Sequence, residues 1–273
     1  MMDYRSKLVI FTDLDGTLLD RLTYSYASVA PALELLRQKK IPVVFCSAKT
    51  RAEQEVYRRE LGIGDPFIVE NGGAIFIPHG YFPFSFDYDR TLGGYFVIEI
   101  GMPYQQVRLI LEKTRTKIGI DFKGFGDMSP EEIAKETGLD LDMARRAKER
   151  EYDETVKLEG KRETIERVMD AIEKAGLNYV HGGTYYALMG GNDKGKAVAI
   201  LTELFRRKLG EIQTIGIGDS LNDRPLLSTV DIPILVKKPE GQWEEMGLPR
   251  LRRVEGIGPL GWRQAIEEFI EQL

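Results

Sequence analysis

The chain has few of the residues that build disulfide frameworks or zinc sites. Its one cysteine, Cys46, cannot form an intramolecular disulfide. The two histidines, His79 and His181, lie far apart in the sequence and lack cysteine partners at the spacing of zinc ligands. The sequence therefore argues against a disulfide scaffold and against a zinc site, and a reducing compartment is expected.

Long apolar runs and an excess of positive charge are also absent. No stretch reaches the roughly 20 apolar residues that a membrane-spanning helix needs, and the short apolar run near the N-terminus leads into acidic residues, unlike a signal peptide. The net charge is −5, whereas nucleic-acid-binding proteins normally present a basic face. We expect a soluble, cytoplasmic protein that binds neither membrane nor nucleic acid, and the oligomeric state is left open.

What the chain does contain is a repeating pattern of strands and helices with one interruption. Its 273 residues, 42% of them hydrophobic, are enough for one large domain or two ordinary ones. Short apolar runs alternate with helical patterns at both ends of the chain, as in a parallel sheet covered by helices. Between them the order of elements changes to an α+β pattern. We predict an α/β core formed by residues 1–84 and 189–273, with an inserted α+β unit at 85–188.

The first chemical motif is a pair of aspartates behind an apolar run. Residues 8–11 are continuously apolar, which predicts a strand buried on both faces. If the extended geometry continues, Asp13 and Asp15 point to the same side, because side chains alternate along a strand. Two neighbouring carboxylates repel each other unless a cation such as Mg²⁺ joins them. The alternative is an ordinary turn rich in Asp and Gly.

Two further motifs could hold an anion. Ser47 lies where an apolar run meets a helix, a place at which a hydroxyl and backbone N–H groups bind phosphate, and Lys49 adds positive charge nearby. An ordinary helix N-cap is the alternative for this serine. Lys194 stands at a predicted helix start, where the helix dipole disfavours a cation unless an anion is close. A solvated lysine is the alternative there.

A last motif could complete a metal site. Asp219, Asn222 and Asp223 follow another apolar strand at 213–217. Their oxygens could join those of Asp13 around a cation, although an Asx-turn is the alternative. The carboxyl ends of parallel strands meet at one edge of a sheet, so all four motifs are expected there together. Such a combination of acids, hydroxyl and lysine predicts a site for a phosphoryl group.

With these motifs the chain resembles the haloacid dehalogenase (HAD) superfamily of aspartate-nucleophile phosphotransferases. The resemblance rests on Asp13-Leu14-Asp15-Gly16-Thr17, on Ser47, on Lys194 and on Gly218-Asp219-Ser220-Leu221-Asn222-Asp223. Within that superfamily it is similar to the mannosyl-3-phosphoglycerate phosphatases, through residues 46–53, 70–73, 124–129, 150–154 and 188–195. The resemblance implies a Rossmann-like parallel-sheet core with an inserted α+β cap of the larger, C2B type.

The resemblance also implies roles for individual residues. The implied catalytic residues are Asp13, Asp15, Ser47 and Lys194, and the implied Mg²⁺ ligands are Asp13, Asp15, Asp219 and Asp223. Asp13 would form an aspartyl-phosphate and Asp15 would be the general acid and base. The residues expected to contact a small phosphorylated glycoside are Lys49, Asn71, Gly72, Arg150 and Asn222. Lys49 and Arg150 are the candidates for the substrate carboxylate, since a guanidinium can bind a carboxylate through two hydrogen bonds.

The expected activity is Mg²⁺-dependent hydrolysis of mannosyl-3-phosphoglycerate to mannosylglycerate and phosphate, a step of compatible-solute synthesis. Several alternatives stay open. Glucosyl-3-phosphoglycerate, or sugar phosphates in general, could be the substrate. A hexose phosphomutase of the same architecture would transfer phosphate without releasing it. A phospho-ligand sensor on an inactive scaffold would release none, although the intact pair Asp13 and Asp15 speaks against it.

Overall fold

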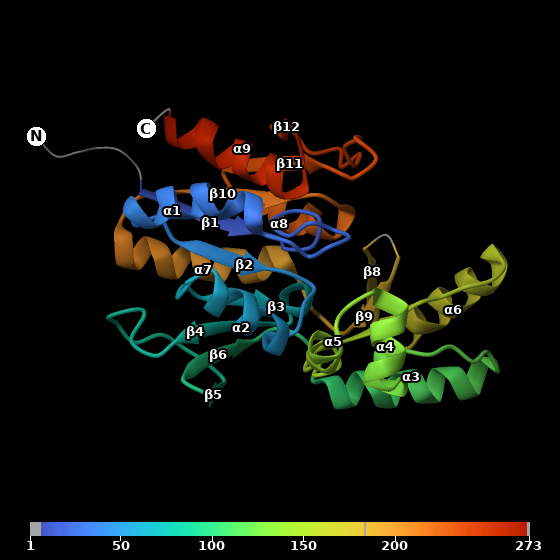
Figure 1. Cartoon of the computed structure of the whole chain (residues 1–273). Coiled ribbons are helices and arrows are strands. Elements are labelled where there is room, and N and C mark those ends of the chain that lie inside the picture. Colours follow the sequence, from blue (N-terminus) through green and yellow to red (C-terminus); the bar gives the residue numbers. More distant parts are fainter. Residues whose placement is uncertain (1–6, 183, 272–273) are drawn as a thin grey trace, which may run out of the picture.

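A nine-stranded, mostly parallel sheet forms the centre of the larger part of the molecule, and the computed structural model describes residues 7–182 and 184–271 (Figure 1). The strands from β12 to β3 pair in parallel, and β4, β6 and β5 continue the sheet antiparallel. In sheet order they are β12 (Arg252–Ile257), β11 (Ile232–Lys237), β10 (Ile212–Gly218), β1 (Lys7–Thr12), β2 (Val43–Cys46), β3 (Phe67–Val69), β4 (Ala74–Pro78), β6 (Tyr95–Glu99) and β5 (Arg90–Leu92).

Strand β1 lies inside the sheet and is buried on both faces, as its apolar run predicted. Leu8 and Ile10 pack into the cluster on one face, and Val9 and Phe11 into the cluster on the other. Neighbouring side chains of a strand point to opposite faces, so four consecutive apolar residues fill both clusters. Helices α1 (Ala30–Gln38), α2 (Arg51–Glu60) and α9 (Gly258–Glu271) cover the first face, and α7 (Lys194–Leu209) and α8 (Arg224–Thr229) cover the second.

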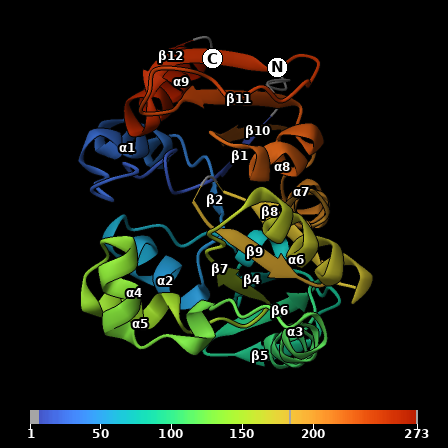
Figure 2. The ribbon, with the colours of Figure 1, turned by 90° about the vertical axis from the view of Figure 1, so that its right-hand side faces the viewer.

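A smaller α+β unit lies to one side of this core, and Figure 2 shows the molecule from that side. Its three-stranded antiparallel sheet has the order β7 (Asp153–Val156), β9 (Tyr186–Met189) and β8 (Asn178–His181). Helices α3 (Tyr104–Ile118) and α6 (Arg162–Lys174) share a core with this sheet. Helices α4 (Pro130–Thr137) and α5 (Leu141–Ala147) pack together beside it. We call this unit the cap.

The first predicted domain boundary, at residues 84 and 85, is wrong. Strands β5 and β6 lie beyond it, yet β6 pairs with β4 along Ala74–Pro78, so both strands belong to the core sheet. The segment just before these strands belongs to the core as well, because Phe82 is buried in it and Phe84 and Phe86 pack against it. We propose that residues 7–101 and 190–271 form the core and that residues 102–189 form the cap.

None of the helices within residues 7–182 and 184–271 has the length and apolar character needed to cross a bilayer.

Candidate active site

The sheet brings the predicted motifs to one edge. Asp13 follows β1 directly, and its N–H donates to the carbonyl of Ile217 on the neighbouring strand β10 at 2.9 Å. Asp219 follows β10, and Ser47 follows β2 on the other side of β1. These parallel strands deliver their side chains at their carboxyl ends, as the topology predicts.

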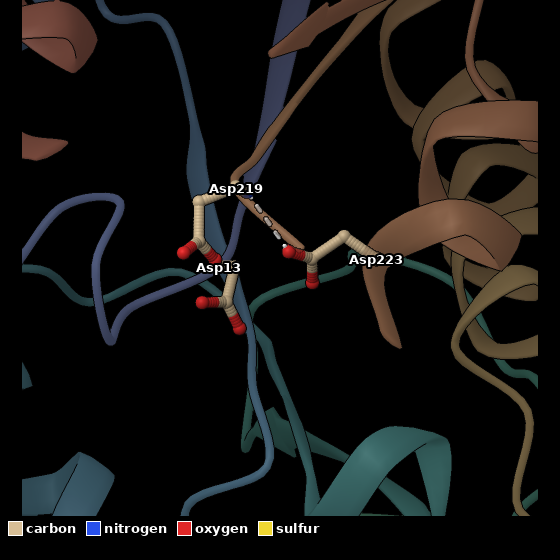
Figure 3. Close-up of side chains that lie close together, drawn as sticks. All are labelled: Asp13, Asp219 and Asp223. Atoms are coloured by element: carbon tan, nitrogen blue, oxygen red, sulfur yellow. Dashed lines mark hydrogen bonds between the residues drawn. The ribbon is translucent and has the colours of Figure 1, made fainter. Parts of the chain in front are cut away.

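Three buried carboxylates meet there. Asp13, Asp219 and Asp223 each contribute an oxygen, and these atoms lie within 4.8 Å of one another (Figure 3). Asp223, at the end of the short 3₁₀ helix η4 (Leu221–Asp223), accepts hydrogen bonds from the N–H groups of Asp219 at 3.1 Å and Ser220 at 3.3 Å. Carboxylate oxygens are the donors that hard divalent cations prefer, so this set fits Mg²⁺.

Two glycines make room for the acids. A Cβ atom at Gly16 would lie 2.7 Å from a carboxylate oxygen of Asp219, and one at Gly218 would lie 2.6 Å from Asp223. Any larger residue at either position would displace a carboxylate of the cluster. Both glycines are therefore needed for the carboxylates to pack closely.

Lys194 supplies the positive charge inside the cluster. Its Nζ lies 2.9 Å from Asp13 and 2.7 Å from Asp223, and the residue is only 1% exposed. Burial acts to lower the pKa of Lys194, but the two carboxylates outweigh it and the pKa is raised. The lysine stands at the first position of α7, where Asp193 caps the helix by accepting from the N–H groups of Gly195 and Lys196.

Two cations, Lys194 and the Arg21 guanidinium 3.0 Å from Asp219, face the three acids and do not balance them. Burial, followed by the charge of Asp223, raises the pKa of Asp13 well above its usual range, although Lys194 acts in the opposite direction. Burial and Asp223 likewise raise the pKa of Asp219 to about 6. Both shifts express an unfavourable concentration of negative charge, which a divalent cation would relieve.

Asp15 lies outside this cluster and has its own cation. Lys49 Nζ is 3.1 Å from Asp15 and 3.3 Å from Glu53, and the Lys49 side chain is 6% exposed against 37% for Asp15. Burial lowers the pKa of Lys49, but Asp15 and Glu53 more than offset it and the pKa is raised. The ammonium also lies 4.9 Å from the centre of the Tyr24 ring. The half-exposed carboxylate of Asp15 is thus free to meet a ligand from the cavity side.

Ser47 and Asn71 are held by backbone hydrogen bonds between neighbouring loops. The Ser47 N–H donates to Ile68 O at 3.2 Å, and the Asn71 N–H donates to Ser47 O at 3.1 Å. Ser47 Oγ accepts from the N–H of Lys49 at 3.3 Å, a contact that leaves its proton available; the N-cap of α2 is Thr50, so the expected alternative of an N-cap serine does not apply. Asn71 Oδ1 is buried without a hydrogen-bond partner among the described residues.

A cavity of about 380 Å³ lies between core and cap and is lined by residues of both. Its core wall includes Asp13, Asp15, Ser47, Lys49, Asn71 and Asn222. Its cap wall includes Glu136, Thr155 and Tyr185. The volume suits a small polar molecule that reaches from the acids to the cap.

Gly72 and Arg150, both predicted to contact substrate, have other contacts in the structure. Gly72 packs against the core instead of facing a ligand: its φ is +89°, and a Cβ atom there would lie 2.2 Å from the carbonyl carbon of Asp193. Arg150 does line the cavity, but its guanidinium already donates to Asp153 and to Ala48 O, the latter at 2.9 Å. Arg150 therefore links cap and core whatever it does with a ligand.

The sequence did not indicate two other residues of the site. Arg21 donates to Asp219 at 3.0 Å and to Gly182 O in the cap at 2.7 Å. Its position in an irregular polar loop offered no signal. Glu70 is completely buried between cap and core. Burial raises the pKa of Glu70 to about 8, with Arg150 opposing and Asp153 adding to the shift. A glutamate after a strand, followed by Asn and two Gly, reads as a turn.

Comparison with known proteins agrees with this geometry. A family model described as haloacid dehalogenase-like hydrolase matches residues 10–240. The chain is 51% identical over 265 residues to the glucosyl-3-phosphoglycerate/mannosyl-3-phosphoglycerate phosphatase of Methanococcoides burtonii, covering 97% of each chain. It is 40% identical over 228 residues to the mannosyl-3-phosphoglycerate phosphatase of Pyrococcus horikoshii, covering 84% of this chain and 90% of the relative.

The fold is also similar to that of a solved structure. The sucrose-phosphatase of Synechocystis, in complex with sucrose and phosphate, has a TM-score of 0.62 at 17% identity, covering 97% of this chain and 99% of the other. That identity supports the fold alone. The family model and the full-length relatives go further: the chain belongs to the haloacid dehalogenase-like hydrolases, the family that its four motifs predicted.

Proposed function

We propose that this protein is a Mg²⁺-dependent phosphatase that hydrolyses mannosyl-3-phosphoglycerate through an aspartyl-phosphate. The observation that carries the proposal is the buried cluster of Asp13, Asp219, Asp223 and Lys194, of which Asp13 lines the cavity shared by core and cap. The relatives named for this substrate support its choice. The glucosyl ester is the second candidate substrate, because the relative from Methanococcoides burtonii is named for both esters.

Asp13, Asp219 and the backbone carbonyl of Asp15 are the proposed ligands of Mg²⁺. Asp223 would act behind them, because its oxygens already accept from Lys194 and from two backbone N–H groups. When bound, the ion would offset the charges that otherwise keep an anionic nucleophile away from an anionic ester.

Asp13 would attack phosphorus in line with the ester oxygen of the glycerate. The new bond joins an Asp13 oxygen to phosphorus, while the bond from phosphorus to the glycerate oxygen breaks. Asp15 would give that oxygen its proton, then take a proton from the water that hydrolyses the aspartyl-phosphate. Ser47 and Lys194 would bind the phosphoryl oxygens, whose negative charge spreads in the transition state.

The cap and the neighbouring loops would recognise the rest of the substrate. Lys49 and Arg150 line the cavity and bring positive charge toward the glycerate carboxylate. Glu136, Thr155 and Tyr185 line the opposite wall and offer oxygen atoms to sugar hydroxyls. Asn71 Oδ1, which has no described partner, could accept from one of these hydroxyls.

Phosphate release from a panel of esters, with Mg²⁺ and with EDTA, tests the proposal. The panel should hold the mannosyl and glucosyl 3-phosphoglycerates, a plain sugar phosphate and an aryl phosphate. We expect the glycosyl phosphoglycerates to give the highest kcat/KM and EDTA to stop release. A preference for the plain sugar phosphate would contradict the substrate assignment.

Asp13→Asn tests the nucleophile. It should abolish turnover of every ester, because a neutral amide cannot form the acyl-phosphate. Asp142→Asn is the control, since the Asp142 side chain is 80% exposed on α5. Wild-type rates in the Asp13 variant with Mg²⁺ present would show that another group attacks phosphorus.

A further inference from the structure

One buried carboxyl group of the core accepts hydrogen bonds from three consecutive backbone N–H groups of a short cap segment. Glu70, which follows β3, is completely buried. Its carboxylate accepts from the N–H groups of Glu151 at 2.9 and 3.1 Å, of Tyr152 at 2.7 Å and of Asp153 at 2.9 Å. Consecutive backbone N–H groups that converge on one carboxyl group hold it through several directional hydrogen bonds. We call residues 150–153 the anchor segment.

Other side chains of the core hold the same segment as well. Glu151 accepts from Arg51 Nε at 3.0 Å and from Arg90 Nη2 at 2.8 Å. Asn192 Nδ2 donates to Glu70 O at 2.8 Å and to Tyr152 O at 3.3 Å. The anchor segment is therefore part of the cap in sequence but is fixed to the core in space.

The backbone near Glu70 is bent in an uncommon way. Glu70 has a φ of +46° and Asn71 a φ of +57°, both in the left-handed region that residues with a Cβ seldom adopt. Consecutive residues of this kind persist where surrounding contacts compensate the strain, often at functional sites. Gly73 follows closely, and a Cβ atom there would lie 2.5 Å from Cβ of Tyr152. This bend brings the Glu70 carboxylate to the anchor segment.

The side chains of the anchor segment reach the loop that carries Ser47. Arg150 Nη2 donates to Ala48 O at 2.9 Å, next to Ser47. Asp153 accepts from Arg150 and, at 3.1 Å, from Asn71 Nδ2. The N–H of Asn71 in turn donates to Ser47 O at 3.1 Å. The segment thus contacts Glu70 through its backbone and Ala48 through Arg150, and it reaches Ser47 indirectly, through Asp153 and Asn71.

We propose that Glu70 is a positioning residue for phosphate binding. Its carboxylate fixes the anchor segment, and Arg150 and Asp153 then set the place of the Ser47 loop relative to Asp13. This inference rests on the proposed phosphatase function and extends it to a residue that contacts no substrate.

Glu70→Gln tests the inference, because glutamine keeps the shape but replaces one acceptor oxygen by an NH₂ group that faces N–H donors. Glu154→Gln is the matched control: Glu154 is equally buried and accepts from Tyr104, Arg108 and the Gly126 N–H, away from the Ser47 loop. Binding of inorganic phosphate is measured by calorimetry with Mg²⁺ present, and binding of Mg²⁺ is measured without phosphate.

We expect Glu70→Gln to weaken phosphate binding by about tenfold or more, since small displacements of a positioned group carry large penalties. Mg²⁺ affinity should be unchanged, because the acid cluster is not touched. Glu154→Gln should lower the melting temperature but leave both affinities unchanged. Equal phosphate affinities of folded Glu70→Gln and wild type would overturn the inference.

A second pair of variants protects the test against misfolding. If Glu70→Gln does not fold, Glu70→Asp keeps the carboxyl group but shortens the reach to the three N–H groups, and the same comparison applies. Asp153→Asn should show the same phosphate defect, and its combination with a Glu70 variant should cost less than the sum of the two. Additive losses would overturn the route through Asp153. A wild-type protein that neither binds nor releases phosphate would instead refute the proposed function itself.

Discussion

Replacing Lys194 by methionine should expose the electrostatic strain in the active site. The side chain is 1% exposed and contacts Asp13 and Asp223, so methionine would leave buried carboxylates without their lysine. Removing one partner of a buried ion pair costs about 3–5 kcal/mol. At about 2–4 °C per kcal/mol for a chain of this size, the melting temperature should fall by roughly 6–20 °C.

Two features of this loss follow from the structure. The loss of stability should be largest near pH 8 without metal and smaller near pH 5, because a proton on Asp13 then replaces the missing positive charge. Burial and Asp223 already raise the pKa of Asp13, and the variant removes the charge of Lys194 that opposes them. Mg²⁺ should raise the melting temperature of Lys194→Met more than that of wild type, since it binds an uncompensated cluster.

Thermal unfolding followed by circular dichroism, at both pH values and with or without Mg²⁺, measures these effects. Lys196→Met is the control, because Lys196 lies two positions further along α7 and its side chain is exposed. If Lys194→Met and the wild type had the same melting temperature at pH 8 without metal, the idea that this lysine balances buried acids would be refuted.

Three further outcomes are expected. Burial and Asp223 raise the pKa of Asp219 to about 6, so protons should compete with the proposed Mg²⁺ below that pH. Calorimetry should then find an affinity that falls by up to about tenfold per pH unit below 6, and a flat profile from pH 5 to 8 would contradict the assignment. Gly72→Ala should destabilise the fold and reduce activity more than Gly80→Ala, which has a similar positive φ but open space around it; equal melting temperatures would count against the close contact. Cys46 is buried and burial raises the pKa of its thiol, so a thiol reagent should label it only on unfolding; rapid labelling of the native protein would show that β2 opens.

The convergence of the motifs was predictable because it depends on local pattern and general topology. The continuous apolar runs of β1, β2 and β10 are recognisable without partners, and parallel strands present their carboxyl ends together. This is enough to place Asp13, Ser47 and Asp219 at one edge. Lys194 joins them because α7 begins at the same edge and packs against the core.

The contacts between core and cap were not predictable in the same way. The sequence around β6 indicates a strand, but it does not tell whether the partner is β4 or a cap strand, since pairing is decided by distant packing. The core partner of Arg150 lies 102 residues away in the chain, and the first cap partner of Glu70 lies 81 residues away. No local propensity of either residue predicts such a contact, so Arg150 was expected to have a free guanidinium and Glu70 was overlooked.

The order of strands also governs how the enzyme can be made. β1 is completed on one side by β10, with Lys7 opposite Ile212, so during synthesis one edge of β1 stays without its partner until most of the chain has left the ribosome. At about 5–20 residues per second, this interval is roughly 10–40 seconds. An open edge on an apolar strand invites pairing with other chains. We expect the early helices of the nascent protein to shield that edge, and Asp13 meets Lys194 only when the last third of the polypeptide arrives.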